Sequence, residues 1–97
     1  MNDKELNEKA VALTKALTDQ GKIIEGNWMG YRLLVVPKGA GAVQVEECRR
    51  AFFAGAQALF ASIMTILDPG TEPTEKDLKR MDAIDAELRA FAASVEN

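Results

Sequence analysis

Histidine does not occur among the 97 residues, and Cys48 is the single cysteine. Without histidine the chain has no Ser-His or Cys-His nucleophile and no imidazole to bind zinc. One cysteine cannot form an intrachain disulfide and fits a reducing compartment. The acidic residues follow neither an EF-hand nor a two-metal spacing. We therefore expect no metal, no cofactor and no enzymatic activity.

An excess of basic residues is also missing, because the formal net charge is −3 and the isoelectric point is about 4.9. Proteins that bind duplex nucleic acid gain most of their affinity from Lys and Arg, so this class is disfavoured. The net charge remains compatible with a small anionic or nucleotide ligand held by two or three arginines. The first ten residues contain no apolar signal core, and we expect a cytoplasmic protein with no contact to a membrane.

Aromatic residues are few, six in all, yet 47% of the residues are hydrophobic. This composition predicts a single helical domain over residues 1–97 with an aliphatic, alanine-rich core. The longest uncharged run covers residues 51–67, and its large side chains cluster on one arc of a helix. The opposite face has only small residues, which are Ala51, Ala54, Gly55, Ala58, Ala61 and Ser62. Because small side chains allow close approach, we expect this face to be the interface of a homo-oligomer.

The apolar periodicity predicts a mainly α fold with helices at about 3–20, 43–67 and 75–95. Asn2 and Glu5 have the spacing of a capping box, as do Thr74 and Asp77 before the last helix. Gly21 is a typical C-terminal stop. The short turn of sequence DPGTEPT then predicts an antiparallel hairpin of the last two helices.

Residues 22–36 fit two structures. Their apolar side chains recur with the spacing of a helix face, but Gly26 and Gly30 each cost a helix interior about 1 kcal/mol relative to Ala. The Gly-Asn pair and the LLVV stretch fit a short β-hairpin instead. We favour a helix with one end loosened by glycine and leave the hairpin open.

One group of residues combines the chemistry that binds nucleotides. Aromatic faces stack on bases, and guanidinium groups pair with phosphates. The candidate ligand-binding residues are Trp28, Tyr31, Arg32, Arg49 and Arg50. The structural alternative is that Trp28 and Tyr31 pack residues 22–36 onto the helical hairpin. The arginines would then pair with Glu46, Glu47 or the acidic residues of the last helix.

Several strings are similar to those of a known group. The strings GNWMGYR, VEECRRAFFAGAQALFASIM, DPGTEPT and LKRMDAIDAELRAF resemble small uncharacterised phage and prophage proteins over about residues 20–95. A Gly-Tyr-Arg element before two antiparallel helices is also similar to the anti-CBASS sponges, oligomeric phage proteins that sequester cyclic oligonucleotides. That similarity implies that Tyr31 and either Arg49 or Arg50 hold the ligand. The longer loop and the additional N-terminal helix depart from the sponge pattern.

Together these features predict a non-enzymatic phage-type accessory protein in the host cytoplasm. It would bind a ligand or a host component as a homo-oligomer, with an anti-defence sponge for a nucleotide signal as the specific form. The alternative is a protein–protein interaction module with an acidic surface, acting as an inhibitor or a scaffold.

Overall fold

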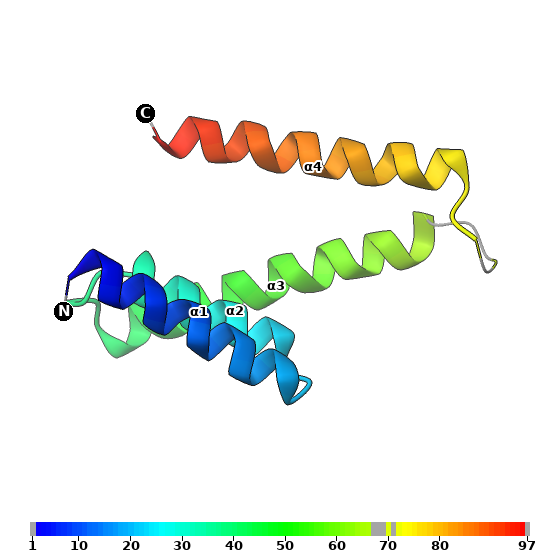
Figure 1. Cartoon of the computed structure of the whole chain (residues 1–97). Helices are drawn as coiled ribbons and strands as arrows, with labels where there is room; N and C mark the ends of the chain where they lie inside the picture. The colour runs from blue at the N-terminus through cyan, green and yellow to red at the C-terminus, as the bar shows by residue number, and fades with distance from the viewer. Residues whose placement is uncertain (1, 67–69, 71, 97) are drawn as a thin grey trace. The chain divides into compact units, whose positions relative to one another are not determined.

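The computed structural model describes residues 2–66, 70 and 72–96, and within them it contains helices and no strand. The helices are α1 (Asp3–Asp19), α2 (Ile23–Leu34), α3 (Ala42–Ile66) and α4 (Glu75–Glu96) (Figure 1). The mainly α prediction is confirmed, and residues 22–36 form a helix rather than a β-hairpin. The predicted helix end at Leu67 and residues 68, 69 and 71 of the turn lie outside the described residues. None of the described helices is both long enough and apolar enough to cross a membrane.

The chain divides into two compact units, Met1–Leu59 and Phe60–Asn97. The first unit contains α1, α2 and most of α3, and its buried apolar residues are Ala10, Trp28 and Val36. The second unit contains the end of α3 and the whole of α4. Each unit is described separately below.

Local sequence signals set both ends of α1. The Asn2 Oδ1 accepts a hydrogen bond of 2.8 Å from the Glu5 amide, which confirms the predicted cap. At the other end Gly21 adopts φ +81°, and the Lys22 amide donates to the Leu17 carbonyl at 2.7 Å. This is the Schellman arrangement, in which a residue without a side chain takes the left-handed conformation. The chain therefore reverses tightly from α1 into α2.

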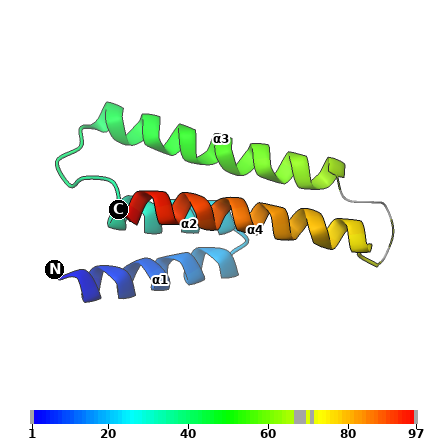
Figure 2. The ribbon, with the colours of Figure 1, turned by 90° about the horizontal axis from the view of Figure 1, so that it is seen from above.

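The two glycines of α2 bring that helix against α1, and the two helices pack as a hairpin (Figures 1 and 2). A Cβ atom at Gly26 would lie 2.9 Å from the Thr14 carbonyl oxygen, and one at Gly30 would lie 3.2 Å from the Thr14 hydroxyl. That hydroxyl donates to the Ala10 carbonyl at 2.9 Å and lies 3.1 Å from the Gly26 carbonyl oxygen. The missing side chains of these glycines permit this close contact, a packing role that the sequence analysis did not assign to them.

In the second unit a capping box begins α4, as predicted. The Asp77 amide donates to the Thr74 hydroxyl at 3.0 Å, and the Thr74 amide donates to the Asp77 carboxylate at 3.1 Å. Arg80 lies 3.8 Å from the same carboxylate, and its guanidinium also donates to the Ile66 carbonyl at the end of α3. Arg80 thus ties the last turn of α3 to the start of α4. The packing of these two helices along their full length stays a prediction.

We predict that Gly26→Ala destabilises the protein by about 1–2 kcal/mol, because the new methyl group must displace backbone of α1 and this overpacking outweighs the gain in helix propensity. Urea unfolding followed by circular dichroism measures the change. Gly39→Ala is the matched control, since a Cβ atom there meets nothing within 4 Å, and its effect should stay within about 0.5 kcal/mol. Equal effects of the two substitutions would contradict a close α1–α2 contact.

Candidate functional site

Trp28 lies inside an aromatic cluster, which we define as Trp28, Tyr31, Phe52 and Phe53. Only 1% of Trp28 is exposed, and its ring centre lies 6.1 Å from that of Tyr31 and 5.7 Å from that of Phe52. The Tyr31 and Phe52 centres are 5.4 Å apart. These tilted contacts are ordinary aromatic packing. The face of Trp28 is therefore covered by protein and is not open to a stacked base.

Arg49 links α2 to α3 within the first unit. Its Nη2 atom lies 2.8 Å from the Glu25 Oε2, and its guanidinium carbon lies 4.5 Å from the ring centre of Phe53. The pair of charges is partly exposed, with 40% of the arginine side chain accessible, so it contributes on the order of 1 kcal/mol or less. The cation–π contact adds a second constraint on the same group. Sequence reasoning missed Glu25, because its partner lies 24 positions away and only the fold brings the two together.

Arg50 interacts with residues of its own helix. It lies 3.4 Å from Glu46 and 3.9 Å from Glu47, and all three side chains are mostly exposed. Pairs with this spacing are common on the solvated surface of a helix. The pairs of Arg50 with Glu46 and Glu47 are among those that the structural alternative named, whereas the pair of Arg49 with Glu25 is not.

Tyr31 and Arg32 line different hollows of the first unit. Arg32 is exposed and borders a hollow of about 240 Å³ together with Pro37 and Lys38. Tyr31 borders a groove between α1 and α2 instead. The five predicted ligand residues are thus divided among an aromatic cluster, two sets of ion pairs and two hollows. Their joint role in binding a ligand stays a prediction.

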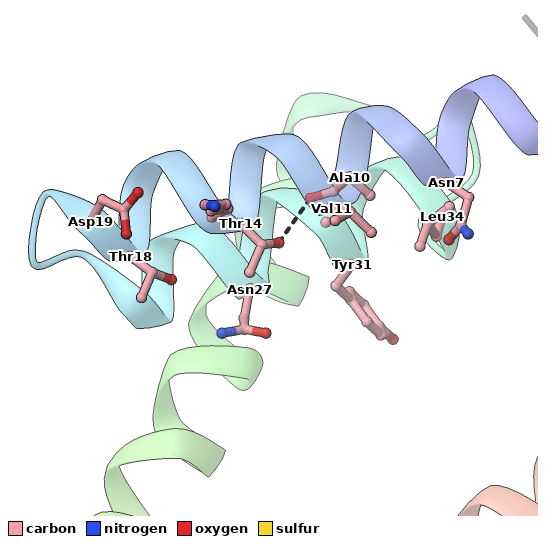
Figure 3. Close-up of a pocket in the computed structure, with 11 residues that line it drawn as sticks. Asn7, Ala10, Val11, Thr14, Thr18, Asp19, Asn27, Tyr31 and Leu34 are labelled. Carbon is pink, nitrogen blue, oxygen red and sulfur yellow. Dashed lines mark hydrogen bonds between the residues drawn. The ribbon is translucent and has the colours of Figure 1, made fainter.

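The groove between α1 and α2 has a volume of about 480 Å³ (Figure 3). Its lining combines small and apolar residues with polar ones. The former include Ala10, Val11, Gly30 and Leu34, and the latter include Lys15, Asp19 and Asn27. Tyr31 is 40% exposed, and its ring projects from α2 on the same side as Asn27. The groove was not predicted, although two glycines four residues apart on a helix signal close packing of this kind.

The size and lining of this groove can be compared with those of known ligand sites. Its volume falls in the range of small-molecule sites, and its lining offers an aromatic wall, a cation and a carboxylate. Among the described residues, no three potential metal ligands lie close enough together to hold an ion.

The small face of α3 is exposed on the chain. We call Ala51, Ala54, Gly55, Ala58, Ala61 and Ser62 the small-residue face, and every one of these residues is exposed. A Cβ atom at Gly55 would meet nothing within 4 Å. The role of this face in an oligomer remains a prediction.

These observations define a small helical protein with one tightly packed hairpin, an apolar groove and exposed apolar helix surfaces. Comparison with protein-family models, with curated proteins and with solved structures found no match for the chain.

We predict that Trp28→Ala destabilises the protein by about 3–5 kcal/mol, because it removes the central ring of a packed cluster and leaves a cavity. Tyr31→Ala should cost about 1–2 kcal/mol, since its ring is already partly in water. Urea unfolding followed by circular dichroism gives both free energies. Equal losses for the two substitutions would contradict the burial of Trp28.

Proposed function

We propose that the protein is a non-enzymatic interaction module that works as a homo-oligomer through the small-residue face of α3. One observation carries this proposal: the helix surface is uncharged over residues 51–66 and yet exposed on the chain. A helix face that stays in water typically displays Lys and Glu, whereas an exposed apolar surface marks an interaction site. Phe60 and Met64, on another side of the same helix, are each more than 60% exposed as well.

The sequence supports a proposal for the kind of partner and the place in which this module acts. The resemblance of AFFAGAQ and the DPG turn to small phage and prophage proteins supports an accessory protein that acts on a host component in the host cytoplasm. The negative net charge supports a partner with a basic surface, because complementary charge favours association. The partner would be inhibited or scaffolded by the oligomer.

Light scattering on the purified protein tests the oligomer directly. We expect a mass at least twice the chain mass of 10.6 kDa. Ala58→Glu should lower the mass to that of one chain, because it places a charge at the centre of the small-residue face. A wild-type mass of one chain at micromolar concentration would refute the proposal.

Gln57→Glu is the matched control, since it introduces the same charge at the adjacent residue but on another side of α3. Its mass should equal that of the wild type. Gly55→Ala provides a second readout, because in an uncovered helix it should stabilise the protein by about 1 kcal/mol. Close packing of a second copy at Gly55 would instead make the substitution destabilising.

A nucleotide ligand is the second candidate, and the half-exposed ring of Tyr31 at the wall of the groove favours it. An aromatic side chain beside apolar residues can hold a base, and Lys15, which also lines the groove, supplies a positive charge. For this candidate function, the proposed binding site is the groove between α1 and α2 rather than the five ligand residues predicted from the sequence.

A thermal-shift screen with cyclic dinucleotides and trinucleotides tests the nucleotide candidate. A ligand at 100 times its Kd should stabilise the protein by about 2.7 kcal/mol, which raises its melting temperature by several degrees. The shift should disappear in Tyr31→Ala and persist in Arg50→Ala, whose side chain pairs on the surface of α3. No shift of the wild type with any member of the panel would exclude this candidate.

A further inference from the structure

Arg32 and Lys38 border the same hollow of the first unit, which we call the basic hollow. It has a volume of about 240 Å³ and is lined from α1, the end of α2, the connecting segment and the first turn of α3. Arg32 and Lys38 are its charged lining residues, and no acidic residue is among the described residues that border it. All of these walls belong to the unit Met1–Leu59. The shape of the basic hollow is therefore set within one unit.

Arg32 differs from the other two arginines of the first unit. Arg49 and Arg50 each pair with glutamates of the same unit. Those pairs engage every glutamate that this unit has on α2 and α3. Within the described part of the first unit, neither Arg32 nor Lys38 forms an ion pair. Their two charges are thus available to an anion that enters the hollow.

The segment that carries Lys38 has a defined backbone. The Ala40 amide donates to the Pro37 carbonyl at 3.0 Å, which closes a turn around Lys38. Val36, immediately before this turn, is buried. Binding at a preformed site loses less conformational entropy than binding at a segment that must first be ordered. Lys38 therefore begins from a backbone position beside the hollow that needs no rearrangement.

The negative charge of the whole chain does not oppose an anion at this place. The first unit contains eight basic and seven acidic residues, whereas the second contains four basic and eight acidic residues. The acidic excess of the chain thus belongs to the second unit. An anion near Arg32 meets a unit with a slight excess of positive charge.

The size and the walls of the basic hollow select among anions. Sites for drug-sized ligands have volumes of about 300–1,000 Å³, and this hollow is smaller. Its remaining lining is apolar and includes Leu6, Leu33 and Val45. A guanidinium group pairs with two oxygens of a phosphate at once, and an ammonium group adds a point charge. The combination fits a phosphate group that carries a short aliphatic chain.

We propose that the basic hollow binds small aliphatic phosphate monoesters. The Arg32 guanidinium pairs with two phosphate oxygens, Lys38 contributes the second positive charge, and the apolar walls contact the carbon chain. This site is separate from the groove between α1 and α2 and from the small-residue face, so it extends beyond the proposed function.

A nuclear magnetic resonance titration of the ¹⁵N-labelled protein at constant ionic strength tests the site, with inorganic phosphate and n-propyl phosphate as ligands. We expect amide shifts concentrated in residues 32–45 and a millimolar Kd, because the two cations are exposed and partly screened by water. Burial of one methylene group strengthens binding by about fourfold, so n-propyl phosphate should bind at least fourfold more tightly than inorganic phosphate. Equal affinities, or no shift in this segment with either ligand, would overturn the proposal.

Substitutions separate the site from a general effect of charge. Arg32→Gln should weaken the binding of n-propyl phosphate by about fivefold or more, because it removes the charged fork, and Lys38→Gln should weaken it less. Arg50→Gln is the matched control, since it removes the same charge from an exposed side chain that pairs on the surface of α3, and its Kd should equal that of the wild type. An equal loss in Arg32→Gln and Arg50→Gln would overturn the proposal.

The outcome of this titration is independent of the oligomer. Light scattering decides the proposed function, whereas the Kd of n-propyl phosphate and its dependence on Arg32 decide the basic hollow. Occupation of the hollow by carboxylates of the second unit would abolish binding, and this result also overturns the proposal. Lys38→Gln, in a connecting segment, provides the test if Arg32→Gln fails to fold.

Discussion

The contact between Gly26 and the backbone of Thr14 is the constraint on which the first unit depends. A Cβ atom at residue 26 would stand 2.9 Å from a carbonyl oxygen of α1, a separation that real side chains do not tolerate. Because this position has no side chain, α2 lies directly against α1, and the Thr14 hydroxyl can reach carbonyl oxygens of both helices. The same approach fixes the rotation of α2 about its axis. Trp28 is thereby directed into the aromatic cluster with Phe52, and Glu25 toward Arg49.

The two units differ in how many of their apolar residues they bury. The first unit buries Ala10, Trp28 and Val36 within itself, whereas the second buries none of its described apolar residues. The capping box at Thr74 and the hydrogen bond from Arg80 to the Ile66 carbonyl hold the start of α4 in place without a core.

The predicted ligand residues illustrate why residue types alone do not identify a site. Aromatic rings and guanidinium groups are the chemistry that recognises a nucleotide, but the same groups pack and pair within proteins. Here the ring of Trp28 is covered, and Arg49 is shared between Glu25 and the ring of Phe53. Tyr31 keeps part of its ring at the wall of a groove that the packing of α1 and α2 creates. Tyr31 is thus the more accessible of the two predicted aromatic residues, and the packing of α1 against α2 decides where its ring lies.

The sequence by itself determined the helical class, the ends of α1 and the start of α4, because caps at Asn2, Gly21 and Thr74 act over three or four neighbouring residues. It also showed that residues 51–66 form an uncharged helix with one small-residue face. The tertiary structure decided that Gly26 lies at the close contact of a helix pair, and that Arg49 binds a glutamate on another helix. Both results depend on contacts between residues 12 or more positions apart, and such contacts follow from how helices pack, which local spacing does not encode.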